Sequence, residues 1–251
     1  MRAINGRGAL IGLDIGTGGA RALAVDATGA IVAQASSQYP LSSPRPGWSE
    51  QDPEHWWAAA QAVLRSVAAE LREPPLGLGL TGQMHGAVFL DGRDAVIRPA
   101  MLWNDQRTAR QCGAMTEKVG RDRLIEISGN PAVTGFQAPK ILWLRDEEPA
   151  SYARVARVLL PKDFIRLRLT GHAATDASDA SGTSLLDLRR RDWSGELLDG
   201  FDIPRRWLPE VYEGPAPTGA ISASAAGSTG LPEGLLVAAG AGDNAAAAVG
   251  T

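Results

Sequence analysis

The stretch ALIGLDIGTGGARALAVD, residues Ala9–Asp26, decides how the rest of the chain can fold. Two apolar runs, residues 10–13 and 23–25, flank a glycine-rich segment, residues 14–21. Paired apolar runs around a glycine-rich turn are typical of a β-hairpin. We therefore expect two adjacent antiparallel strands here, with the later elements arranged around them.

The turn of this hairpin has the composition of an anion-binding loop. Gly16, Gly18 and Gly19 have no Cβ atom, so successive backbone N–H groups can converge on a phosphate. Thr17 adds a hydroxyl donor and Arg21 adds a cation. It is not a Walker loop, because neither Gly-Lys-Ser/Thr nor a helix follows. Two interpretations stay open: a phosphate-binding turn, or a tight hairpin that binds nothing.

Asp14 ends the first predicted strand and would lie beside a phosphate bound at the turn. A carboxylate in such a place is explained chiefly as a direct or water-mediated partner of Mg²⁺. The sequence therefore makes Asp14 the candidate metal-binding residue.

The composition favours a globular protein that binds small molecules. A chain of 251 residues, 44% of them hydrophobic, can bury a substantial core, and one elaborated domain is the default expectation. The net charge of −3, without a basic block or a membrane-length apolar run, argues against nucleic acid or membrane partners. Cys112 is the only cysteine and the three histidines are scattered, which argues against a disulfide and a zinc site. We expect a cytoplasmic protein.

Local signals extend the fold beyond the hairpin. Residues 30–38 alternate well enough to predict a third strand of the same antiparallel meander. Asp52, Pro53 and Glu54 follow the order of an N-cap, a first-position proline and a first-turn acid. A helix is therefore expected from that point to about Leu71.

Polar groups follow the next predicted strand. Leu76–Leu80 predicts a short buried strand, and a strand after a helix suggests a helix packed on a mixed sheet. The loop Gln83–Gly86 follows at the carboxyl end of that strand, where open α/β sheets contact ligands. His85 is a candidate binding residue here, with an ordinary surface histidine as the alternative. Residues 87–103 predict a hairpin that ends in the polar cluster Trp103–Arg107.

The middle of the chain predicts an inserted helical layer between residues 108 and 157. Its expected helices are Ala109–Val119, Arg121–Ile127, Ala138–Arg145 and Ala150–Arg157, and later elements are strands at 158–161 and 184–188 and helices at 162–169 and 195–200. The Ser/Asp/Thr-rich segment 175–183 reads either as a solvated loop or as the lining of a polar cleft.

Asp243 opens the last predicted helix, directly after the buried strand 235–239 and a glycine turn. One explanation is helix capping, since Asp is a preferred N-cap residue. The other is catalysis, because a carboxylate held at a strand end and facing a cleft can take a proton from a substrate hydroxyl.

Taken together, the motifs DIGTGGAR, PGWSEQDPEHWW, GQMHG, LWNDQR, LLPKDFIRLRLTG, SDASGT and GAGDNAAAAVG resemble the FGGY family of carbohydrate kinases, and within it the xylulokinases. The match spans nearly the whole chain in the right order. It implies an α/β fold of the actin-like, ribonuclease-H-like type: a mixed sheet that opens with an antiparallel three-stranded meander, helices on both faces and an inserted helical layer. The resemblance also implies transfer of phosphate from Mg·ATP to a sugar hydroxyl.

The resemblance implies a role for each matching residue. Asp14 would hold Mg²⁺ through water, Asp243 would be the catalytic base, and Thr17, Gly18 and Arg21 would border the transferred phosphate. The sugar-binding residues would be Met84, His85, Asn244, Trp103, Asn104 and Asp105. The Met84-His85 pair separates this chain from glycerol kinases, which resemble it but carry an Arg-Glu pair there.

Two departures from the family pattern matter. Gly18 stands where the family usually has Ser or Thr, which removes a hydroxyl donor from the phosphate turn. The family continues with a second domain of similar size that carries the adenine site, so residues 1–251 resemble an amino-terminal, sugar-binding domain whose carboxyl-terminal nucleotide domain is missing.

The expected function is ATP-dependent phosphorylation of D-xylulose at O5. Activity on another ketose or polyol, or a non-catalytic sugar-binding domain, are the alternatives. The expected partners are a small sugar, ATP and Mg²⁺, and a homodimer is left open.

Overall fold

One mixed β-sheet organises the computed structural model, which describes residues 8–250. The strand order is β13-β14-β5-β1-β2-β3, and β15 also pairs with β5. These strands are β1 (Leu10–Ile15), β2 (Gly19–Val25), β3 (Ile31–Gln38), β5 (Gly77–Gly82), β13 (Pro217–Ala220), β14 (Leu236–Ala238) and β15 (Ala241–Gly242). The antiparallel pairs β1–β2 and β2–β3 and the parallel pair β1–β5 confirm the predicted meander and mixed sheet.

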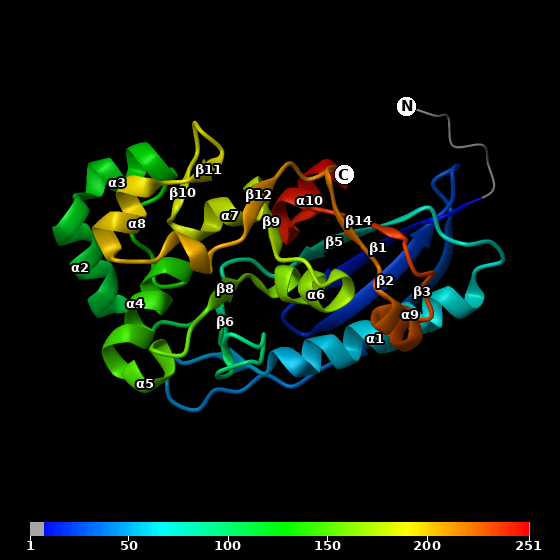
Figure 1. Ribbon diagram of the computed structural model, residues 1–251, viewed down its shortest axis with the longest axis horizontal. Helices are drawn as coiled ribbons and strands as arrows, with labels where there is room; N and C mark the ends of the chain where they lie inside the picture. The colour runs from blue at the N-terminus through cyan, green and yellow to red at the C-terminus, as the bar shows by residue number, and fades with distance from the viewer. Residues whose placement is uncertain (1–7, 251) are drawn as a thin grey trace.

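Side chains alternate along β1, so that one face of this strand is buried. Ile11, Leu13 and Ile15 lie in the main hydrophobic core, because residues two apart share a face of a strand. Helix α1 (Pro53–Glu70) packs on that face (Figure 1). Its predicted start is confirmed: the Asp52 carboxylate accepts the N–H of the second helical residue and proline stands in the first turn.

Three helices share the core on the face of the sheet that α1 covers. Helices α6 (Pro161–Thr170) and α9 (Ala223–Thr229) contribute to the same core as α1. The opposite face of the sheet carries an apolar groove of about 510 Å³, and its lining includes Leu10, Gly12 and Leu236. No helix among the described residues 8–250 is both long and apolar enough to cross a membrane.

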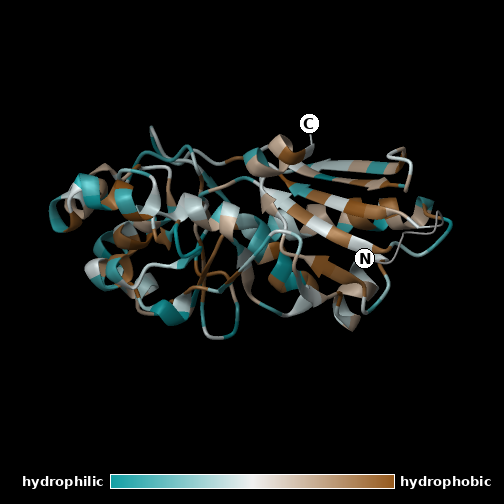
Figure 2. Ribbon diagram, turned by 90° about the horizontal axis from the view of Figure 1, so that it is seen from above, coloured by the Kyte–Doolittle hydropathy of each residue, from teal (hydrophilic) through white to brown (hydrophobic). Residues whose placement is uncertain are grey.

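The inserted helices gather around a second hydrophobic core beside the sheet (Figure 1, left). They are α2 (Ala109–Val119), α3 (Arg121–Ser128), α4 (Gln137–Glu147) and α5 (Pro149–Tyr152), and α8 (Gly195–Phe201), from beyond the predicted insertion, packs into the same core. Brown, hydrophobic stretches run through both halves of the molecule in Figure 2, which fits two cores rather than one. The predicted insertion therefore forms a lobe of its own.

Two predictions fail where a distant partner replaces a local one. β6 (Val88–Leu90) pairs with β8 (Arg157–Leu159), and β7 (Ala100–Met101) pairs with β4 (Glu50–Gln51). Of the hairpin expected over residues 87–103, only isolated bridges remain. The helix expected to reach Arg157 ends at Tyr152, because Arg157 belongs to β8.

The segment 175–183 is not a solvated loop. It forms the end of β9 (Ala174–Asp176), helix α7 (Ala177–Ala180) and the short 3₁₀ helix η1 (Ser181–Thr183), and most of it is buried. The remaining elements are β10 (Leu186–Asp187), β11 (Asp192–Trp193), the 3₁₀ helix η2 (Arg205–Trp207), β12 (Glu210–Tyr212) and α10 (Asp243–Gly250).

A buried ion cluster explains why this polar segment lies inside. The Lys162 ammonium on α6 lies 2.6 Å from Asp163, 2.7 Å from Asp176 and 3.3 Å from Asp179, all with side chains at most 1% exposed. Burial alone would lower the pKa of Lys162, but the three carboxylates raise it above its usual range. The cluster ties α6 to β9 and α7.

We predict that Lys162→Met lowers the free energy of unfolding by about 3–5 kcal/mol, because it leaves the buried Asp176 and Asp179 carboxylates without the cation that pairs with them. Lys118→Met is the matched control: Lys118 is 53% exposed and pairs with Asp202 at the surface, so its loss should change stability by less than about 0.5 kcal/mol. Urea unfolding measures both. Equal losses in the two variants would contradict this account of the cluster.

Candidate functional site

The carboxyl ends of β1, β5 and β15 meet at one edge of the sheet. In the parallel register, Thr81 on β5 is paired with Asp14 on one side and with Ala241 on the other. Strand ends of this kind are where open α/β sheets place ligand-contacting loops. Sequence segments far apart in the chain therefore leave the sheet side by side.

A pocket of about 240 Å³ lies at this edge. It is lined by Thr17, Met84, His85, Trp103, Asp243 and Asn244. All of these are residues that the sequence singled out, and they come from the β1–β2 turn, the loop after β5, the loop after β7 and the start of α10. The structure brings them together around one hollow.

A chain of hydrogen bonds fixes one wall of the pocket. The Trp103 indole N–H donates to the Thr17 hydroxyl over 3.0 Å, and that hydroxyl donates to Gln83 Oε1 over 3.3 Å. The Gln51 amide donates to the Thr17 carbonyl over 2.7 Å and accepts from the Gln83 amide over 3.0 Å. Gln51 and Gln83 are not among the site residues predicted from the sequence, although both stand inside the quoted motifs PGWSEQDPEHWW and GQMHG.

The glycine-rich turn itself is closed by backbone contacts. The Gly16 N–H donates to the Gly19 carbonyl over 3.1 Å, and the Tyr39 hydroxyl donates to the Gly16 carbonyl. A Cβ on Gly19 would lie 2.5 Å from the Ser37 carbonyl, so this position requires glycine. A Cβ on Gly18 would meet nothing within 4 Å. Gly18 therefore leaves room that a Ser or Thr side chain could fill.

His85 is held in one tautomer. Its Nδ1 atom lies 2.8 Å from the Gly182 carbonyl, which can only accept, so Nδ1 carries the proton and Nε2 keeps a lone pair. Burial lowers the pKa of this imidazole below its usual range, with the bond to Gly182 acting in the opposite sense. The neutral ring can thus accept a hydrogen bond from a ligand in the pocket.

The segment α7–η1 supports the pocket from beneath without lining it. Gly182 of η1 accepts from His85, and the Ser178 hydroxyl of α7 accepts the N–H of Gly242 over 3.3 Å. This segment therefore contacts both the loop after β5 and the strand end before Asp243.

Asp14 and Asp243 form the acidic side of the site. Burial raises the pKa of Asp14, the negative charge of Asp243 raises it further, and Arg21 opposes both. Among the described residues, Asp14 Oδ1 is buried without a hydrogen-bond partner. Asp243 is the first residue of α10, one position inside its expected N-cap place, and its Oδ1 accepts the Asn244 N–H over 2.7 Å.

The remaining predicted residues lie outside the pocket lining. Asp105 is fully buried, and its carboxylate accepts from the Ser49 N–H and from Arg107. The Asp105 carboxylate is therefore bonded to other groups of the protein, and it organises the loop behind Trp103. Asn104 is exposed, as is Arg21, which faces Asp14 from the neighbouring strand β2.

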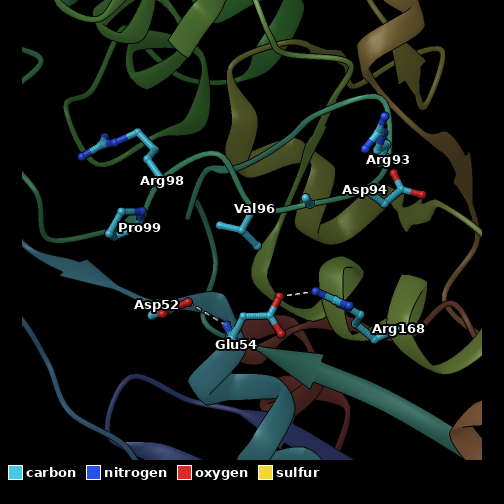
Figure 3. Close-up of a pocket in the computed structure, with 9 residues that line it drawn as sticks. Asp52, Glu54, Arg93, Asp94, Val96, Arg98, Pro99 and Arg168 are labelled. Carbon is cyan, nitrogen blue, oxygen red and sulfur yellow. Dashed lines mark hydrogen bonds and ion pairs between the residues drawn. The ribbon is translucent and has the colours of Figure 1, made fainter.

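A larger hollow of about 450 Å³ lies between the start of α1 and the loop 93–99 (Figure 3). Several of its charged groups are already paired: Arg168 with Glu54, and Asp94 with Arg157. The Arg98 side chain is directed away from the hollow in Figure 3 and pairs with Glu50. This hollow therefore lacks the converging unpaired groups of the smaller pocket.

Comparison with known proteins agrees with this geometry. The profile of the FGGY family of carbohydrate kinases, N-terminal domain, matches residues 9–250. The chain belongs to this family. It is 46% identical over 242 residues to the xylulose kinase of Klebsiella pneumoniae and 43% identical over 241 residues to that of Escherichia coli (strain K12). The FGGY resemblance drawn from the motifs is confirmed.

A solved structure shows the same fold. The crystal structure of xylulose kinase from Rhodospirillum rubrum superposes with a TM-score of 0.93 at 34% identity, covering 96% of this chain and 50% of that one. The two sequence matches cover 96% of this chain and 49% of each relative. The chain thus spans about half the length of the FGGY relatives it matches.

The residues at the FGGY site fit a magnesium ion. Asp14 offers a buried carboxylate oxygen without a partner, and its pKa is raised first by burial and then by the negative charge of Asp243, which a cation would offset. No group of three or more His, Cys, Asp or Glu within residues 8–250 could hold a metal alone. Mg²⁺ commonly takes one or two carboxylates and completes its shell with water and phosphate.

We predict that the His85 imidazole titrates below pH 6.5, because its pKa is lowered in the folded chain. The unfolded chain then binds more protons just below pH 6.5, so this histidine's contribution to stability is present above that pH and is lost as the pH falls through the folded pKa. An NMR titration of the three histidines, assigned with a His85→Gln variant, measures the midpoint. A His85 midpoint above 6.5 would contradict the burial argument.

Proposed function

We propose that this chain is the sugar-binding part of an ATP-dependent kinase that phosphorylates D-xylulose to D-xylulose 5-phosphate. The observation that carries the proposal is the pocket in which His85, Trp103 and Asp243 converge beside Asp14. The identity of 46% to a protein named xylulose kinase supports the choice of sugar. A second, nucleotide-binding domain would complete the cleft, and the cytoplasm would supply the ATP.

The pocket has the size and the polarity for a small sugar. Its volume of about 240 Å³ is below the range of roughly 300–1,000 Å³ that is usual for drug-sized ligands. His85 Nε2 would accept a sugar hydroxyl, and Asn244 would offer both a donor and an acceptor. Met84 and the half-exposed Trp103 indole would cover the C–H face of the sugar.

Asp243 would be the catalytic base. Its Oδ1 already accepts the Asn244 N–H, which orients the carboxylate and leaves Oδ2 to take the proton of the O5 hydroxyl. As that proton leaves, the sugar oxygen becomes able to attack the terminal phosphate of ATP. The contribution of the protein to such a transfer is mainly positioning and charge stabilisation.

The phosphate would lie over the β1–β2 turn. Thr17 and Gly18 would border it, and Arg21, exposed on β2 opposite Asp14, would offer a cation. Asp14 would hold Mg²⁺ through water. When bound, this ion neutralises charge on the phosphates.

The proposal is tested by turnover of the complete polypeptide that contains this chain. ADP release should be fastest, as kcat/KM, with D-xylulose among a panel of D-xylulose, D-ribulose, glycerol and gluconate. A clearly higher kcat/KM with another sugar of the panel would show that this sugar, and not D-xylulose, is the substrate. No turnover with any sugar, together with sugar binding, would indicate a non-catalytic domain.

The chain 1–251 alone should release no ADP above background, because losing the positioning of ATP can remove about 7–11 kcal/mol of barrier lowering. Robust turnover by the isolated chain would contradict the need for a second domain.

We predict that Asp243→Asn abolishes phosphate transfer in the complete polypeptide, because an amide cannot accept the proton. The variant keeps a side-chain oxygen that can accept the Asn244 N–H, so the unfolding free energy should change by less than about 0.5 kcal/mol. Ser222→Asn, at the N-cap of α9 and remote from the pocket, is the control that should leave turnover unchanged. If the Asp243→Asn variant retains most of its turnover, the base lies elsewhere.

A further inference from the structure

The first turn of α4 holds the loop that carries His85. The Gln137 amide donates to the Gly86 carbonyl over 3.0 Å, and the Phe136 ring stacks on the imidazole with 4.3 Å between centroids and 11° between planes. The Lys140 ammonium lies 2.8 Å from the His85 carbonyl oxygen and also donates to the Gly135 carbonyl. Helix α4 belongs to the second lobe, so the loop is fixed from outside the sheet.

His85 needs such restraint because of its backbone. Its φ angle is +67°, in the left-handed region that side chains with a Cβ rarely occupy without support. The peptide carbonyl that Lys140 holds belongs to this same residue. A Cβ on Gly182 would lie 2.4 Å from the His85 Nδ1 atom, so the ring is confined between η1 and Phe136.

Lys140 is an unusual residue for its surroundings. Its side chain is fully buried, and no carboxylate in the described part of the chain forms an ion pair with it. Burial lowers its pKa to about 7, with the more distant Asp105 opposing this effect. Two backbone carbonyls, those of His85 and Gly135, accept hydrogen bonds from the Lys140 side chain. An apolar side chain would fill this space without the free-energy cost of burying an amine, so the two hydrogen bonds explain why a lysine stands here.

We propose that Lys140 is a positioning residue for sugar binding: from α4 it ties the His85 carbonyl to that of Gly135 and so keeps the left-handed turn that fixes the His85 imidazole against Gly182. The inference rests on the proposed role of His85 in the sugar pocket. Lys140 does not line the pocket, and its proposed effect on sugar binding passes through His85.

The first test is the imidazole of His85 in the chain without sugar. ¹⁵N NMR distinguishes a protonated from an unprotonated ring nitrogen, and the wild-type chain should carry its proton on Nδ1. In Lys140→Met the turn relaxes and the spectrum should show a mixture of tautomers. Lys118→Met, which removes an exposed lysine, is the matched control and should keep the wild-type spectrum. An unchanged His85 spectrum in Lys140→Met overturns the proposal, as does a wild-type proton on Nε2.

The second test is D-xylulose affinity by calorimetry with chain 1–251. Lys140→Met should bind about tenfold more weakly, the effect of one misplaced polar partner. In a His85→Ala background the same substitution should have no further effect, because its influence passes through His85. A further loss of similar size there would show a general structural role and overturn the proposal.

Lys140→Gln, which keeps an amide donor, is the second variant if Lys140→Met fails to fold. The proportion of the two tautomers in its spectrum should lie between those of wild type and Lys140→Met. If wild-type chain binds no xylulose, the proposed function fails, while the imidazole spectrum still decides the positioning role of Lys140.

Discussion

The parallel pairing of β5 with β1 and β15 is the constraint on which the site depends. It brings Asp14, the Gln83–Gly86 loop and Asp243 to one edge of the sheet, although nearly the whole chain separates the first from the last. Close backbone approach makes the pairing possible. A Cβ on Gly82 would lie 2.9 Å from the Ile15 carbonyl, and one on Gly240 would lie 1.9 Å from the Leu80 carbonyl. Gly240 also has a φ of +78°, so hardly any residue other than glycine fits at this position of the turn.

The second lobe holds the loop that carries His85 in place beside the sheet. From α4 and its N-cap it supplies Phe136, Gln137 and Lys140 to the His85 loop, and the segment α7–η1 adds acceptors for His85 and Gly242. The buried Lys162 cluster anchors α7 to α6 beneath them. Side chains locked by such neighbours are pre-organised, and a pre-organised site binds its ligand in a defined geometry. The inserted lobe is therefore part of the site's framework.

The sequence predicted best the features that depend on neighbours in the chain. The β1–β2 hairpin and the Asp52 cap of α1 are set by turn and capping residues within a few positions. Features set by distant partners were missed. Asp105 belongs to a polar cluster that suggested a binding site, but its carboxylate is hydrogen-bonded to Ser49 and Arg107. Residues 175–183 are polar enough for a solvated loop or a cleft lining, and only the ion pair with Lys162 shows that their acids are buried. No local pattern could reveal that Gln83 and Gln51 meet.

A crystal structure of chain 1–251 grown with D-xylulose would show directly whether these strand ends form the proposed ketose site. Sugar density is expected in the pocket of about 240 Å³, with one hydroxyl within hydrogen-bond distance of His85 Nε2 and another facing the Asp243 carboxylate. Density for the sugar in the hollow beside Arg168, with the His85 pocket filled only by water, would contradict this proposal.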